Sequence, residues 1–319
     1  MAFTDSISES KDENIASDGD VTPNENDVAI PLTAQEQDAK TRAQMEAIDH
    51  EVRANQRLTS ELLDISKLAD GFSVINNGSP TNIGFRQGCD YLATQYKSYR
   101  AVRGDGNCYY RAFLFALVEQ VCKKSTTADE LKRISEYVGR SIEDVIKCGY
   151  DRFTIDMFHE EMVELLSAVA KEKEQQENTT ASSISSTMYG RLNEENATSD
   201  YCVWYLRVIT SSYLKSDPGR FVHFLEDPSY IDIATYCDKE IDPMGKECSM
   251  VGVLALAEAF RINVDIEYMD GRPLDGTSNT KKLVKHSFGG NHDGKPCDDN
   301  STLRITLLYR PGHYDILYK

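Results

Sequence analysis

The nine residues from Asp105 to Phe113, D-G-N-C-Y-Y-R-A-F, constrain this chain more than any other stretch of it. The first three are turn-forming residues that tolerate unusual backbone angles. After them, apolar residues recur at helical spacing, namely Ala112, Phe113, Ala116, Leu117 and Val121. The pattern therefore predicts a tight turn that opens into a helix, with Cys108 at the junction.

This position gives Cys108 a possible chemical role. At the start of a helix the backbone N–H groups are unpaired, and the positive end of the helix dipole favours an anion. Both effects favour the thiolate, which is the form that attacks a carbonyl carbon. The amides of the same turn could also hold the oxyanion that forms after attack. A lone cysteine is more often a small buried hydrophobe, but the D-G-N turn favours a nucleophile here.

A cysteine nucleophile needs a base and a group that orients the base, and the chain end offers both. Residues 303–309 are predicted as a strand, Pro311-Gly312 as a turn and 313–318 as a second strand. Because residues i and i+2 of a strand share a face, His313 and Asp315 form a pair. The carboxylate is expected to bond one imidazole nitrogen while the other nitrogen faces Cys108.

These motifs together resemble a known family. G-D-G-N-C-Y-Y-R-A-F is similar to the nucleophile motif of the ovarian-tumour (OTU) class of deubiquitinating cysteine peptidases, and its Tyr-Arg-Ala-Phe continuation resembles the otubain branch. Residues 199–214, 264–270 and 307–319 are similar to otubains as well, so the resemblance runs from about Met45 to the final residue. It implies an α+β fold of the OTU type, in which helices cover a small central β-sheet and an N-terminal helical arm is attached.

The resemblance also implies an activity and a site. Cys108, His313 and Asp315 match the family's nucleophile, base and orienting acid, and Asp105 belongs to the loop that forms the oxyanion hole. We include Asp105 among the catalytic residues but assign the hole to backbone amides, because a carboxylate aimed at the oxyanion would repel it. As a turn residue, its side chain would instead stabilise the loop. The implied reaction is hydrolysis of the bond between a ubiquitin C-terminus and a lysine amine, without a metal or organic cofactor.

The implied partners are ubiquitin and polyubiquitin chains, with a preference for chains linked through the forty-eighth residue of ubiquitin. Two alternative functions remain open. One is a non-catalytic protein that binds ubiquitin and a ubiquitin-conjugating enzyme and so blocks ubiquitin transfer. The other is a peptidase with the same chemistry and unrelated substrates. We expect the chain to act as a monomer.

Composition narrows the classes of partner and compartment. The net charge of −17 argues against nucleic acid, because phosphate binding needs a basic surface. No apolar stretch approaches the length of a membrane span. The eight cysteines contain no C-x-x-C motif, and the N-terminus does not resemble a signal peptide. These features favour a reducing compartment, which we take to be the cytoplasm or the nucleus.

Two domains are expected. Residues 1–38 carry ten acidic residues against one lysine and are predicted to be a disordered tail. Residues 39–319 are predicted to be the catalytic domain, including an arm at about 41–70. The arm is predicted to be one long or broken helix, with a polar break at Asn55 and an end at Gly71. Apolar residues at helical spacing form a stripe along it, namely Met45, Ile48, Val52, Leu58, Leu62, Ile65 and Leu68. We expect its C-terminal half to pack on the domain; the resemblance implies that the arm helps to hold a second ubiquitin or a conjugating enzyme.

Further elements follow from apolar periodicity. Helices are expected through 131–145, 158–169 and 250–260, another is expected to be capped by Ser199, and a strand is expected at 263–268. Composition predicts loops at 72–88, 171–186 and 270–301. His286, His292 and Cys297 lie in the last loop, but their spacing fits no zinc site.

Overall fold

The computed structural model describes residues 34–72, 75–76, 79–80, 82–123, 125–176, 184–225, 227–274, 282–289 and 303–319. They belong to two units, Met1–Glu46 and Ala47–Lys319. In the first unit the described part is the beginning of helix α1 (Ala34–Asn55). This helix starts inside the segment predicted as a tail, so it includes residues 34–38. The rest of the predicted tail lies outside the described residues.

The second unit is built on a sheet whose strand order is β1-β4-β8-β7-β5-β6. Strands β5 and β7 pair in parallel and the other neighbours are antiparallel. The strands are β1 (Leu63–Asp64), β4 (Ser98–Arg100), β5 (Asn263–Tyr268), β6 (Val284–Phe288), β7 (Arg304–Arg310) and β8 (His313–Tyr318). A separate short hairpin joins β2 (Ile75–Asn76) and β3 (Ser79–Pro80).

The predicted hairpin at the chain end is confirmed. Strands β7 and β8 are joined by Pro311 and Gly312, and Gly312 has a φ of +76°, which glycine adopts without steric cost. The register places Arg310 opposite His313 and Leu308 opposite Asp315. This register decides which side chains of the hairpin lie beside the candidate base.

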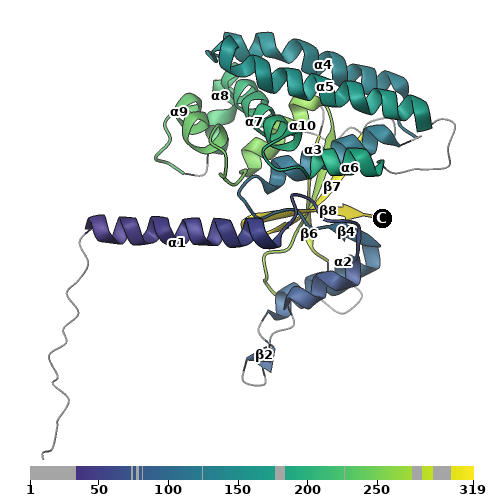
Figure 1. The fold of residues 1–319 in the computed structure, drawn as a ribbon. Coiled ribbons are helices and arrows are strands. Elements are labelled where there is room, and N and C mark those ends of the chain that lie inside the picture. The colour runs from purple at the N-terminus through teal and green to yellow at the C-terminus, as the bar shows by residue number, and fades with distance from the viewer. Residues whose placement is uncertain are drawn as a thin grey trace, which may run out of the picture. The chain divides into compact units, whose positions relative to one another are not determined.

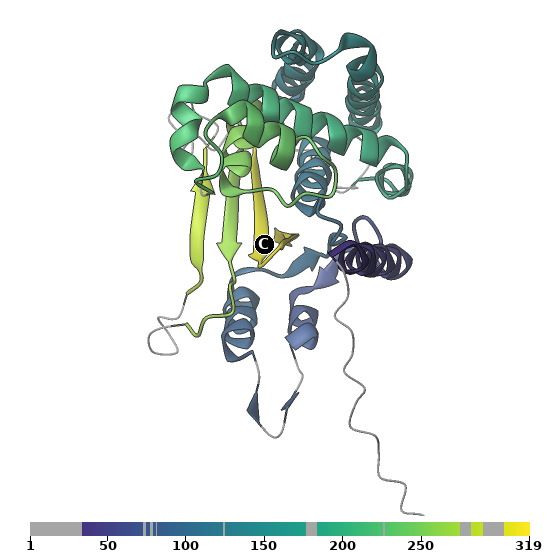
Figure 2. The same ribbon diagram turned by 90° about the vertical axis from the view of Figure 1, so that its left-hand side faces the viewer.

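Helices cover both faces of the sheet (Figures 1 and 2). On one face, Tyr314 and Ile316 of β8 join a large core with the main helices, which are α3 (Cys108–Cys122), α4 (Ala128–Lys147), α5 (Arg152–Gln176), α7 (Thr198–Ser216) and α10 (Met250–Phe260). On the other face, Leu308 and Leu317 pack with Leu92 of α2 (Ile83–Gln95) and with the 3-10 helix η1 (Ile65–Phe72). The sheet with its helices has the predicted α+β architecture.

Helix α3 is the central helix of the larger layer. It contacts β7 and β8 on one side and α5 and α7 on the other. All of its residues except Gln120 are buried, including the apolar set that predicted it. Because α3 is enclosed in this way, its first residue, Cys108, is held in a fixed place next to β8.

The arm differs from a continuous helix. Helix α1 ends at Asn55, where the polar break was predicted, but residues 56–62 are not helical. Leu58, Ile65 and Leu68 are buried, so the C-terminal half of the arm does pack on the domain as expected. Leu62 is largely exposed, because it lies in the non-helical stretch where helical spacing no longer decides which side chains point inward.

Three predicted loops contain regular structure. Helix α2 begins at Ile83, α5 continues to Gln176, and β6 occupies Val284–Phe288. Among the described strands, β6 pairs with β5 alone at the sheet edge, so most of its side chains are exposed and its sequence resembles a loop. Ser199 is not the cap of α7, because the helix begins at Thr198. His292 and Cys297 lie outside the described residues.

A third, smaller core joins the ends of α7 and α10 to short helical elements. These elements are α8 (Pro218–Phe221), η2 (Val222–Phe224), α9 (Ile233–Tyr236) and the π-helical turn η3 (Cys237–Ile241), while α6 (Ser186–Leu192) precedes α7. Among the described ranges, no helix has the length and apolar character needed to cross a membrane.

Candidate active site

The D-G-N turn packs tightly against a second loop. Gly106 has a φ of +72°, and a Cβ atom on it would lie 2.0 Å from the carbonyl oxygen of Gly245. A side chain at position 106 would therefore be excluded both by backbone conformation and by this contact. The contact fixes the turn before α3 against the segment that precedes α10.

Asn107 holds the two loops together instead of capping α3. Its Oδ1 atom accepts hydrogen bonds from Nη2 of Arg207 at 2.8 Å and from the amide of Gly245 at 2.9 Å. It makes no side-chain cap bond to the helix. The first amides of α3 therefore have no cap from Asn107, as the predicted oxyanion hole requires.

Asp105 stabilises the same turn. Its Oδ1 accepts a hydrogen bond from the amide of Asn107 at 2.9 Å, and its Oδ2 accepts two from Arg111, at 2.7 and 3.0 Å. Arg111 is itself buried and pairs with Asp200 at 2.6 Å. These bonds support a turn-stabilising role for Asp105. Its direct participation in the chemistry stays a prediction.

His313 and Asp315 lie on one face of β8, as the strand alternation predicted. Nε2 of His313 and Oδ1 of Asp315 are 2.9 Å apart. Asp315 is fully buried and also accepts hydrogen bonds from the amide of Val102 at 3.0 Å and from Arg310 at 2.5 Å. Burial alone would raise the pKa of Asp315, but the bond from His313 and the charge of Arg310 outweigh it and lower the pKa. The carboxylate is therefore held in its ionised form.

His313 connects this carboxylate to the thiol. Burial would lower the pKa of His313, but the hydrogen bond to Asp315 and the interaction with Cys108 raise it to about 9. Since Nε2 faces Asp315, the nitrogen left for Cys108 is Nδ1. The structure thus brings Cys108, His313 and Asp315 together in one row, although more than two hundred residues separate the cysteine from the other two.

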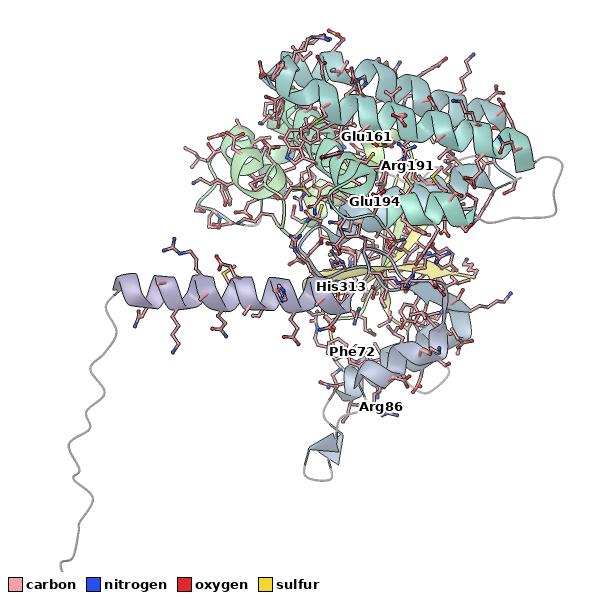
Figure 3. All side chains as sticks on the ribbon, in the orientation of Figure 1. Phe72, Arg86, Glu161, Arg191, Glu194 and His313 are labelled. Atoms are coloured by element: carbon pink, nitrogen blue, oxygen red, sulfur yellow. The ribbon has the colours of Figure 1, made fainter. Side chains whose placement is uncertain are left out.

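A groove lies beside this row. His313 and Phe72, both labelled in Figure 3, line it together with Val102, Gly104 and Pro311, and its volume is about 610 Å³. The side chain of His313 is 18% exposed, whereas Cys108 is 1% exposed. His313 is therefore the member of the row that faces the groove.

The raised pKa of His313 has a consequence for stability. A group whose pKa rises from 6.5 to about 9 on folding stabilises the native state fully below pH 6.5 and loses that effect as the pH passes 9. The contribution at low pH is on the order of 3 kcal/mol. We expect urea unfolding to show a larger stability difference between wild type and His313→Gln at about pH 6 than at about pH 9.5. An equal difference at both pH values would mean that Cys108 and Asp315 do not hold the imidazolium.

Several residues of the site were not predicted. Arg310 and the Val102 amide fix Asp315, and Arg207 fixes Asn107. Glu247 also lies beside the base, and burial raises the pKa of its carboxyl group. Arg207 carried a signal, because a charged residue in the middle of an apolar helix needs a buried partner. The others depend on tertiary contacts that the sequence does not display.

A comparison with protein families decides the identity. The family model described as Peptidase C65 Otubain matches residues 51–319. The chain belongs to the otubain family. Among curated relatives of this otubain, the human "Ubiquitin thioesterase OTUB1" is 33% identical over 282 residues, which cover 88% of this chain and 90% of the relative. The "Ubiquitin thioesterase otubain-like" protein of Caenorhabditis briggsae is 31% identical over 86% of this chain and 85% of the relative.

Solved structures agree with this membership. The otubain matches a chain in a complex of h/ceOTUB1, ubiquitin aldehyde and UBC13~Ub with a TM-score of 0.71 and 26% identity, over 89% of this chain and 99% of that one. A chain in a second complex, of h/ceOTUB1, ubiquitin aldehyde and UBCH5B~Ub, matches with a TM-score of 0.69 and 26% identity, over 90% of this chain and 99% of that one. The expected resemblance and the expected OTU-type fold are both confirmed.

Proposed function

We propose that this otubain is a deubiquitinating cysteine isopeptidase, which hydrolyses the bond between a ubiquitin C-terminus and a lysine amine. Membership in a peptidase family and relatives named ubiquitin thioesterases support this function. The observation that carries the proposal is the row of Cys108, His313 and Asp315 at the start of α3, in which Asp315 is hydrogen-bonded to the imidazole that lies beside the thiol. A thiol, a base and an orienting carboxylate in this order are the parts that cysteine-dependent acyl transfer needs.

In the proposed mechanism, Cys108 gives its proton to Nδ1 of His313 and its sulfur attacks the isopeptide carbonyl carbon. Backbone amides at the start of α3 stabilise the oxyanion. Collapse of this intermediate breaks the C–N bond, and the imidazolium protonates the leaving lysine amine. Asp315 stabilises the imidazolium throughout. Water, deprotonated by His313, then hydrolyses the thioester, which releases the ubiquitin carboxylate and restores the thiol.

The proposed substrates are ubiquitin conjugates, and we propose a preference for chains linked through the forty-eighth residue of ubiquitin. A second function is proposed beside hydrolysis. The similar solved complexes contain the ubiquitin-loaded enzymes UBC13~Ub and UBCH5B~Ub together with OTUB1. This chain would likewise bind a ubiquitin-conjugating enzyme and block ubiquitin transfer without cleavage.

Digestion of a panel of di-ubiquitins that differ only in linkage tests the hydrolase and its linkage preference, and a ubiquitin-transfer assay with UBC13 or UBCH5B tests the second function. We expect the wild type to cleave the preferred linkage, Cys108→Ala to lose cleavage, and Cys148→Ala to retain it as a matched control. Cleavage by Cys108→Ala at the wild-type rate would disprove the mechanism. Separately, if Cys108→Ala does not slow ubiquitin transfer by UBC13 or UBCH5B, the proposed block of ubiquitin transfer is wrong.

A further inference from the structure

A second pocket lies among α4, α7 and α10, apart from the peptidase site. These helices occupy the upper part of Figure 1, whereas His313 lies near the sheet in the same view (Figure 3). The pocket has a volume of about 520 Å³, which is in the usual range for small-molecule sites. Buried Val145, Ile209 and Ala259 line it, and so do the half-buried rings of Tyr137 and Tyr213.

The carboxylates that line this pocket are already neutralised. Asp144 forms an ion pair with Lys147 at 2.9 Å. Glu258 is fully buried and receives two hydrogen bonds from Arg220, at 2.6 and 2.8 Å. Neither carboxylate therefore adds an uncompensated negative charge to the pocket.

Some of the lining cations are compensated in the same way. Arg133 pairs with Glu130 at 2.8 Å, and Lys215 pairs with Asp238 at 2.9 Å. Arg140 and Arg261 also line the pocket, and neither has a carboxylate within 4.0 Å among the described residues.

The two unpaired arginines are both solvent-exposed, and they lie at different places in their helices. Arg261 follows the C-terminus of α10, where the helix dipole favours a cation. Arg140 lies inside α4, where the dipole gives no such reason, and its guanidinium stands 5.8 Å from the ring centroid of Tyr137. The pocket thus presents two uncompensated positive charges beside an apolar and aromatic wall, in a chain whose net charge is −17.

We propose that this pocket binds a small amphipathic organic anion. Its apolar or aromatic body would pack on Val145, Ile209 and the two tyrosines, and its carboxylate, phosphate or sulfonate would be held by Arg140 and Arg261. Guanidinium groups suit such planar or tetrahedral anions, because they donate two parallel hydrogen bonds. This binding function is separate from ubiquitin hydrolysis and does not depend on it.

Cys148 provides a reporter inside the pocket. Its thiol lies 3.4 Å from the hydroxyl oxygen of Ser212, and it lines the same wall. Cys148 is partly exposed, whereas the other described cysteines are buried. A bound ligand should therefore shield Cys148 from a soluble thiol reagent.

The probe for the test is 8-anilinonaphthalene-1-sulfonate, titrated by fluorescence, and its neutral counterpart is N-phenyl-1-naphthylamine. We expect the sulfonate to bind with one-to-one stoichiometry and each of Arg140→Gln and Arg261→Gln to weaken it about tenfold, the worth of one charge-assisted hydrogen bond. The neutral probe should bind both variants like the wild type. Lys132→Gln, an exposed cation on the same helix outside the pocket, should leave the sulfonate affinity unchanged.

Location is tested by N-ethylmaleimide labelling with peptide mapping. At ten times its dissociation constant, the sulfonate should slow labelling of Cys148 about tenfold by simple occupancy. An unchanged rate at Cys148 would overturn the proposal. So would an equal loss of affinity in Lys132→Gln and Arg140→Gln, since binding would then follow the general surface charge.

Discussion

Replacing Asp315 with asparagine should lower turnover on the order of ten- to a thousandfold while leaving the fold intact. The asparagine oxygen can still accept bonds from His313 and the Val102 amide, but the side chain loses the bond from Arg310 and cannot stabilise the imidazolium that forms as Cys108 loses its proton. Replacement of the orienting carboxylate in another hydrolase cost about four orders of magnitude. An enzyme with a thiol nucleophile should lose less turnover, because a thiol ionises more readily than a hydroxyl.

The control for this variant separates chemistry from binding. Ubiquitin affinity should be the same in Cys108→Ala with and without Asp315→Asn, since Asp315 is fully buried and does not reach a substrate. Turnover at the wild-type level in Asp315→Asn would show that another group orients His313. A parallel fall in affinity and turnover would instead point to damage of the surrounding loops.

Replacing Arg207 with methionine should lower the free energy of unfolding by about 3 kcal/mol or more and abolish labelling at Cys108. Arg207 is fully buried and donates to Oδ1 of Asn107 and to the carbonyl oxygens of Gly106, Ile241 and Lys246. Its removal leaves these acceptors buried without their donor. The turn before Cys108 and the loop before α10 would then lose their shared clamp.

Urea denaturation measures the first effect, and a ubiquitin probe with a C-terminal electrophile measures the second. Arg152→Met is the matched control, because Arg152 is half-exposed and its ion pairs with Glu143 and Asp156 are exposed as well; it should change stability by less than about 0.5 kcal/mol. Arg207→Lys keeps the charge and part of the hydrogen bonding, so its loss of stability should lie between those of Arg207→Met and Arg152→Met. Equal stability of Arg207→Met and Arg152→Met would refute the clamp.

The elements that could be predicted from sequence are those whose pattern is local. The helix after Cys108 was found because its apolar residues repeat at helical spacing, and the β7–β8 hairpin because Pro311-Gly312 marks a turn between two apolar runs. That His313 and Asp315 share a face followed from strand alternation, and their roles rested on the turn before them, the D-G-N-C motif and the family resemblance. These features need no knowledge of what packs against them.

Other features depend on the tertiary neighbourhood. Strand β5 alternates apolar and polar residues, which predicts one face in solvent, yet Asp265 and Glu267 are both buried. Asp265 pairs with Arg304 of β7 at 3.0 Å, and Glu267 accepts a bond from the hydroxyl of Tyr96 at 2.7 Å. The partners that make burial acceptable come from distant segments, so the pattern could not reveal that β5 is covered on both faces.

The most direct test of the account is peptide mapping after reaction with a ubiquitin whose C-terminus carries an electrophile. We expect one adduct, on Cys108, which is absent from Cys108→Ala and unchanged in Cys148→Ala. An adduct on any other cysteine of the wild type would contradict it, and so would labelling of Cys108→Ala at the wild-type rate.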